Sequence, residues 1–200
     1  MDVPLTARLR AGVAVFNAGH YHAAHDAWEP AYLDADGDER DFLQGLIQYT
    51  AAAHHVQEGN HEGAQGLATS ALEYLDGVED RGVALGPVRA WLRACRDGRT
   101  ERPPPLELDG ERPTLGDLEY PAAAVAAPLV AESTGHDVEA LTAGAEYALA
   151  DLADEVVGSP FVTLVLDFLA GTRRGVVVQR LGQHVQRRRS READVEGLFD

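Results

Sequence analysis

The stretch from Phe42 to Gln57 reads FLQGLIQYTAAAHHVQ and contains no aspartate, glutamate, lysine or arginine, although 25% of the chain's residues are charged. It does not alternate between apolar and polar residues with a period of two, so it is not the pattern of a half-buried strand. A helix that is apolar on most of its faces is buried in a globular protein. We therefore predict a buried helix here, surrounded by other helices.

The sequence around this stretch predicts further helices. Apolar residues from Leu5 to Phe16 repeat at three- and four-residue spacing before the stop signal Gly19. The expected helices cover residues 5–18, 20–34, 39–58, 61–76 and 87–97. Similar segments begin at Gly19 and Gly59, and this echo resembles the tetratricopeptide helical hairpin. We predict an all-α fold, an antiparallel multi-helix bundle with tetratricopeptide-like hairpins, over residues 1–97.

Two further regions differ from the first in composition. Residues 98–136 contain six prolines and few aromatic residues, which predicts an extended connector with one short helix in its Ala-rich part, residues 122–131. Residues 137–200 return to a helical composition. We predict that this third region is a C-terminal helical hairpin.

Opposite charges are separated within the C-terminal region. Residues 137–172 hold seven acidic and no basic residues, whereas residues 173–191 hold seven arginines and no acidic residue. We expect the two segments to pair, either within one chain or across a homodimer, and this pairing disfavours nucleic acid as a partner. The run Val176, Val177 and Val178 would supply the apolar face of a helix or, alternatively, form a short strand.

The overall composition narrows the class of protein. The 33 acidic residues outnumber 17 basic ones, all of them arginine, which gives a formal net charge of −16. This excess excludes a surface that coats nucleic acid, and it is typical of proteins that stay soluble in high salt. No apolar run reaches the roughly 18 residues of a membrane span, and the N-terminus lacks a secretory signal. We expect an acidic, halophilic, cytoplasmic protein without a membrane partner.

The uncharged helix contains polar side chains that need partners. Gln44, Gln48 and His55 lie near one stripe of this helix, and His54 points about 100° away from it. A buried polar group without a hydrogen bond costs about 1–3 kcal/mol. The neighbouring helix is therefore expected to supply the hydrogen-bonding or ligand partners of this stripe.

The preceding helix carries the candidate partners. His25 and Glu29 lie four residues apart on one face, with His22, Asp26 and Tyr32 beside them. Helices joined by a short loop usually pack antiparallel, so this face can meet the polar stripe of the next helix. We expect a buried site between the two helices.

Two functions are open for this site. An imidazole and a carboxylate at this spacing can chelate one divalent ion such as zinc, iron, manganese or nickel, and an open position for water would then allow hydrolysis. The candidate metal ligands are His25, Glu29 and His55, and the residues expected to line the site are His22, Asp26, Tyr32, Gln44, Gln48 and His54. Alternatively, His25 and Glu29 form a buried structural pair in a non-catalytic helical interaction module. Neither alternative assigns a catalytic residue, a substrate, or a small-molecule or protein partner.

A longer pattern surrounds the His–Glu pair. The segment HDAWEPAY, residues 25–32, fits HxxxExx(W/Y), with FNAGHY and FLQGLIQ on either side and GNHEGA further on. Together these segments are similar to the family called domain of unknown function 309, over residues 14–76. The resemblance implies an all-α helical bundle and suggests that His25 and Glu29 bind metal, but it brings no known reaction. Pro30 departs from the pattern, and because Glu29 precedes a proline a kink is expected there.

The acidic excess predicts a dependence of stability on salt. Lowering KCl from about 1 M to about 0.1 M lengthens the screening distance from about 3 Å to about 10 Å, so repulsion between carboxylates grows. The melting temperature followed by circular dichroism should fall. A melting temperature that is independent of salt would contradict this interpretation.

Overall fold

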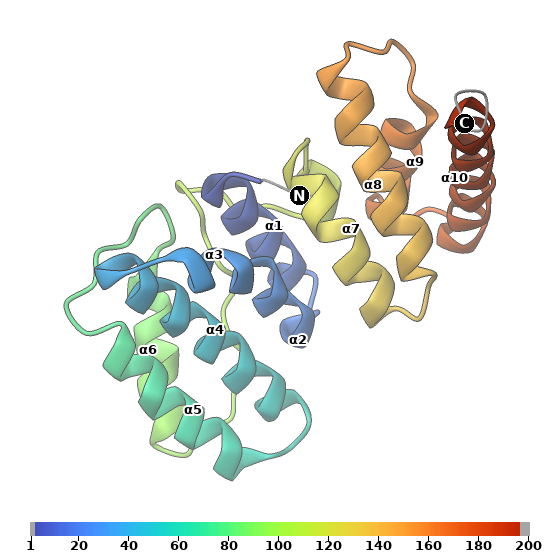
Figure 1. Ribbon diagram of the computed structural model, residues 1–200. Helices are drawn as coiled ribbons and strands as arrows, with labels where there is room; N and C mark the ends of the chain where they lie inside the picture. Colours follow the sequence, from blue (N-terminus) through green and yellow to red (C-terminus); the bar gives the residue numbers. More distant parts are fainter. Residues whose placement is uncertain (1–2, 197–200) are drawn as a thin grey trace. The chain divides into compact units, whose positions relative to one another are not determined.

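The computed structural model describes residues 3–196, which form ten α-helices and two short 3₁₀ turns (Figure 1). The elements of the first part are α1 (Leu5–Asn17), α2 (Tyr21–Ala24), η1 (His25–Ala27), α3 (Glu29–Asp34), α4 (Gly37–Gln57), α5 (His61–Tyr74) and α6 (Leu85–Arg96). Those of the second part are η2 (Leu115–Asp117), α7 (Ala122–Ser133), α8 (Val138–Ala153), α9 (Pro160–Leu169) and α10 (Arg174–Glu196). No strand occurs in residues 3–196, so the all-α prediction is confirmed.

The helices form two compact units. The first contains Pro4–Thr114, and the second contains the described chain from Leu115 onward. The boundary falls inside the Pro-rich segment 98–136, whose later part contributes α7 to the second unit. Within the residues that the structure describes, no helix has both the length and the apolar composition needed to cross a membrane.

Helix α4 is the buried helix of the first unit, as the sequence predicts. Its side chains with no exposed surface are Phe42, Leu43, Leu46, Tyr49, Thr50, Ala52 and Ala53. It packs along α5, and α2, η1 and α3 contact it as well. A Cβ at Gly45 would overlap the Leu75 side chain, so this glycine lets the segment after α5 approach the α4 backbone closely.

The expected helix over residues 20–34 is broken into α2, η1 and α3. The break lies at Trp28, whose φ of −102° and ψ of −23° interrupt the helix before the start of α3. Pro30 follows in the first turn of α3, where the amide hydrogen that proline lacks would have no helical partner. The expected kink is thus confirmed as a break directly before Glu29.

The Trp28 side chain is packed against α1. Its indole is fully buried, and Nε1 donates a hydrogen bond to the carbonyl oxygen of Arg8 at 3.1 Å. A Cβ at Gly12 would overlap the indole ring, so the bare backbone of α1 provides the space that the ring fills. This contact anchors the broken segment to the first helix.

The residues after α6 run as an extended strap across the first unit. The Asn17 side chain donates to the carbonyl oxygens of Leu106 at 3.0 Å and Pro113 at 3.1 Å, and it accepts from the Leu106 amide at 2.8 Å. The Tyr49 hydroxyl donates to the Pro104 carbonyl oxygen at 3.2 Å. These bonds fix the first half of the Pro-rich segment to the helices.

The second unit pairs its acidic and basic helices within one chain. Asp151 is buried on α8, where its carboxylate accepts hydrogen bonds from Ser159 Oγ at 2.7 Å and from Arg188 on α10 at 3.0 Å. Arg189 pairs with Glu139 at 2.9 Å. The valine run 176–178 belongs to the helix α10, so the alternative of a short strand is wrong.

The Trp28 contact predicts the effect of adding one methyl group. Gly12→Ala should destabilise the protein by about 1–3 kcal/mol. The new Cβ overlaps the indole ring, and the packed neighbours leave the ring little room to move. Gly66 on α5 has nothing within 4 Å of its Cβ position, so Gly66→Ala should stabilise by about 0.5–1 kcal/mol through helix propensity. Urea unfolding measures both. Equal stabilisation by the two substitutions would contradict the packing described.

Candidate metal centre

A 3₁₀ turn positions the residues that could hold a metal. In η1, His25 Nε2 lies 2.9 Å from Asp26 Oδ1, and His25 Nδ1 contacts the carbonyl oxygen of His22. His25, Asp26 and Glu29 each present one ligand atom, and these atoms all lie within 4.8 Å of one another. We call these three residues the ligand cluster. Their sequence spacing and the break before Glu29 together place one imidazole and two carboxylates on one side of the segment.

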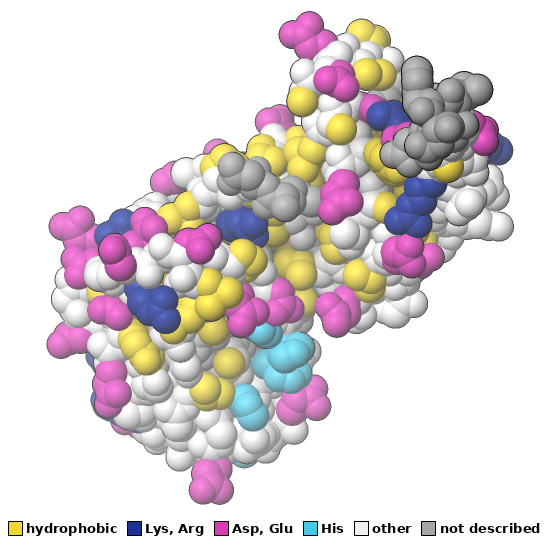
Figure 2. Space-filling view, viewed as in Figure 1, with side chains coloured by type: hydrophobic (Ala, Val, Ile, Leu, Met, Phe, Trp, Pro, Cys, Tyr) yellow, Lys and Arg dark blue, Asp and Glu magenta, His cyan; other side chains and the backbone are white. Residues whose placement is uncertain are grey.

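Two further imidazoles adjoin the ligand cluster. The ring of His22 lies 5.0 Å from that of His25 and also 5.0 Å from that of His54, measured between ring centroids. His54 comes from the C-terminal part of α4, which contacts α2. Figure 2 shows histidine side chains gathered on one face of the molecule with acidic side chains close by.

His54 and His55 face different neighbours. His54 follows Gly45 by nine residues, or about half a turn beyond two full turns, so it points away from the face that contacts Leu75. His55 instead accepts a hydrogen bond from Asn60 Nδ2 at 2.8 Å, and Asn60 Oδ1 caps α5 by accepting from the Gly63 amide at 3.0 Å. The structure therefore brings His54, and not His55, next to the α2 histidines.

The other residues expected at the site have separate surroundings. Tyr32 is bound by Arg40, which donates to its hydroxyl at 2.8 Å and to its carbonyl oxygen at 3.0 Å, with the guanidinium 4.0 Å from the ring centroid. Gln44 and Gln48 are half-buried on α4, and Gln48 Oε1 is buried without a hydrogen-bond partner among the described residues. No hydrogen bond among residues 3–196 joins either amide to the ligand cluster.

The ligand cluster is more exposed than the sequence suggested. The His25 side chain is 24% exposed, that of Asp26 is 34% exposed, and Glu29 lies on the surface. The expectation of a buried His–Glu site, whether metal-binding or structural, is therefore corrected. The cause is the break at Trp28, because the indole takes the inward position at this point of the chain and Glu29 begins α3 on the outside.

The environment shifts the pKa values of two histidines in opposite directions. The hydrogen bond with Asp26 raises the pKa of His25 above its ordinary 6.5, and the negative charges of Asp26 and Glu29 add to this, although partial burial opposes it. Burial lowers the pKa of His54, and the nearby His22 lowers it further. The lowered pKa favours the neutral form of His54, which is the form that an imidazole ligand requires.

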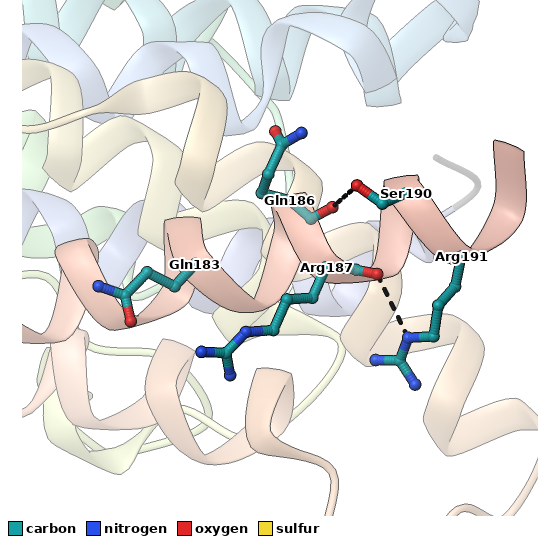
Figure 3. A pocket seen from close by; sticks show the side chains of 5 residues that line it. All are labelled: Gln183, Gln186, Arg187, Ser190 and Arg191. Carbon is teal, nitrogen blue, oxygen red and sulfur yellow. Dashed lines mark hydrogen bonds between the residues drawn. The ribbon is translucent and has the colours of Figure 1, made fainter. Parts of the chain in front are cut away.

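Helix α10 presents a different kind of surface. Figure 3 shows a hollow along this helix, lined by the side chains of Gln183, Gln186, Arg187, Ser190 and Arg191. Two of these side chains bond to the backbone of their own helix: Ser190 Oγ donates to the Gln186 carbonyl oxygen at 3.0 Å, and Arg191 Nε donates to that of Arg187 at 3.2 Å. None of these five described residues is a histidine, a cysteine or a carboxylate, so they do not form a metal-binding set.

Comparison with known proteins confirms the resemblance found in the sequence. Residues 9–67 match the family model described as "Domain of unknown function (DUF309)". The matched segment runs from α1 into α5 and contains the ligand cluster together with His22 and His54. No curated protein matches the chain.

The His25–Asp26 contact predicts a pH effect that one substitution removes. Because the folded-state pKa of His25 is raised, its contribution to stability is complete below pH 6.5 and is lost as pH rises through the folded-state pKa. Asp26→Asn should lower the pKa of His25 towards 6.5. Histidine ring resonances followed by NMR titration in EDTA measure it. Asp34→Asn, an exposed position on α3, serves as the control; an unchanged pKa in Asp26→Asn would contradict the geometry.

Proposed function

We propose that the segment matching DUF309 binds one divalent transition metal ion through His25, Asp26 and Glu29. The observation that carries this proposal is the convergence of one imidazole and two carboxylates, with ligand atoms within 4.8 Å of one another. The rings of His22 and His54 lie close enough to the cluster to offer a second imidazole.

One imidazole and two carboxylates form a donor set that favours zinc or another divalent ion of the first transition series. Imidazole nitrogen together with carboxylate oxygen suits zinc, iron, manganese and nickel. Among the described residues, no arginine forms an ion pair with Asp26 or Glu29, and Asp26 pairs with His25. A cation at this position would replace the proton that His25 shares with Asp26.

A bound metal ion could support a reaction only if one of its coordination positions stays open for water. A bound ion that keeps a water ligand lowers the pKa of that water and supplies a nucleophile for hydrolysis. With His25, Asp26 and Glu29 as ligands, a four-coordinate ion would keep one position for such a water. Hydrolysis is thus the reaction class that this donor set favours.

A second function is favoured by a specific observation at His25. Both ring nitrogens of this side chain already have partners within the chain, Asp26 Oδ1 and the carbonyl oxygen of His22. These contacts tie η1 to α2 without any ion. In this alternative the segment is a non-catalytic interaction module, and the histidine stabilises the turn that joins two short helices.

Metal content separates the two functions. Protein purified in high salt without a histidine tag should carry close to one equivalent of a divalent ion, measured by mass spectrometry of the elements. His25→Ala should lose it. Glu29→Gln, an exposed and isosteric change, should weaken zinc or nickel binding in titration calorimetry by at least about tenfold, because one ligand is removed.

The control variant is His61→Ala, because His61 is exposed at the start of α5 and outside the ligand cluster. It should retain the metal and the affinity of the unmodified protein. Metal retained by His25→Ala would contradict the proposal. Absence of metal from every variant, together with a lower melting temperature for His25→Ala alone, would support the interaction module.

A further inference from the structure

Two adjoining pockets of the first unit lie beside the extended strap. One, of about 420 Å³, is lined by Gly19, Tyr21, Ala53, Val56, Gln57, Thr100, Arg102 and Pro103. The other, of about 360 Å³, is lined by Phe16, Asn17, Tyr21, Arg102, Pro103 and Pro105. They share Tyr21, Arg102 and Pro103, and we call them together the Arg102 cleft. Each volume lies within the range of roughly 300–1,000 Å³ that is typical of small-molecule sites.

Arg102 is the charged group of this cleft. The residue is exposed, and its Nε donates to the Tyr21 hydroxyl at 3.3 Å. Among residues 3–196, no carboxylate lies within ion-pair distance of Arg102, although the chain has about twice as many acidic as basic residues. The two terminal nitrogens are left to donate in parallel, which is the geometry that binds an oxyanion with two hydrogen bonds.

Two polar side chains accompany the guanidinium. Gln57 at the end of α4 and Thr100 at the start of the strap both line the cleft, and neither side chain forms a hydrogen bond with another described residue. An amide and a hydroxyl are neutral donors that can bind the same oxyanion. Gln57, Thr100 and Arg102 are all exposed, so a ligand that enters the cleft can reach their donor groups directly.

The remaining walls of the cleft are apolar. Phe16 and Tyr21 contact each other with ring centroids 4.8 Å apart, and Val56 and Pro103 add aliphatic surface. Such a wall favours a ligand with an aromatic or short aliphatic body. It does not favour a bare inorganic ion, which would leave this surface in contact with water.

The cleft is held in place before any ligand binds. Asn17 bonds the strap at Leu106 and Pro113, and the Tyr49 hydroxyl bonds it at Pro104. Tyr49 in turn stacks on Phe16 with ring centroids 5.0 Å apart. A ligand therefore does not have to order the strap, which lowers the free-energy cost of binding.

We propose that the Arg102 cleft binds a small organic anion, with its carboxylate or phosphate head group on Arg102 and its apolar body against Tyr21 and Val56. None of the three ligand-cluster residues lines either pocket, so this inference does not depend on metal binding. The acidic character of the chain makes the site selective, because repulsion disfavours anions at the rest of the surface.

The test uses the full chain in EDTA, which removes any metal, at the lowest salt that preserves the native circular dichroism spectrum. The probes are benzoate, hexanoate and phenyl phosphate, each compared with a neutral isostere such as benzamide or hexanamide.

Binding is followed by saturation-transfer NMR and by the shifts of the Thr100 amide and the Arg102 Nε resonance. At least one anion should bind at least about tenfold more tightly than its neutral isostere, because a charge-assisted bidentate pair is the strongest hydrogen-bonded contact available. Comparison of the carboxylates with phenyl phosphate identifies the head group.

Matched variants locate the binding. Arg102→Gln should weaken binding of the best anion by at least about tenfold, and Arg102→Lys, which keeps the charge but not two parallel donors, should have an intermediate effect. Arg99→Gln changes an exposed arginine that lines neither pocket and should have no effect. Binding by no probe, equal binding of amide and anion, or equal effects of the Arg99 and Arg102 variants would each overturn the proposal.

Discussion

The packing of the Trp28 indole against Gly12 is the contact on which the first unit depends. The ring is fully buried and is hydrogen-bonded to the Arg8 carbonyl oxygen, and the missing side chain of Gly12 provides its space. At Trp28 the backbone has φ −102° and ψ −23°, which departs from the regular helical values of about −63° and −42°. The chain therefore breaks between η1 and α3, and the ligand cluster forms around that break.

This constraint explains why the site differs from the one that the sequence predicted. The spacing of His25 and Glu29 correctly indicated that they lie together, and Pro30 correctly indicated a kink. The spacing could not predict how deeply the ligand cluster is buried. The depth is set by Trp28, whose partner Gly12 lies sixteen residues earlier, and no local pattern identifies such a contact.

Helix α4 shows the same division between local and long-range information. Its lack of charge predicted burial, and the 3.6-residue period predicted that His54 and His55 lie on different stripes. Which stripe meets the α2 histidines depends on a contact outside the helix, the fit of Leu75 against Gly45. Likewise the Pro-rich segment predicted an extended chain, but its hydrogen bonds to Asn17 come from a residue about ninety positions away. The Arg102 cleft exists only because of that strap, so the sequence alone gave no sign of it.

The metal centre that we propose at the Trp28 break consists of the ligand cluster and its neighbouring histidines. Crystals soaked in zinc or nickel, with X-ray data collected on both sides of the metal absorption edge, would locate a bound ion. We expect one anomalous peak about 2.0–2.2 Å from His25 Nε2 and from carboxylate oxygens of Asp26 and Glu29. A map without a peak at this position, or with its peak between His55 and Asn60, would show that the ligand cluster does not bind the metal.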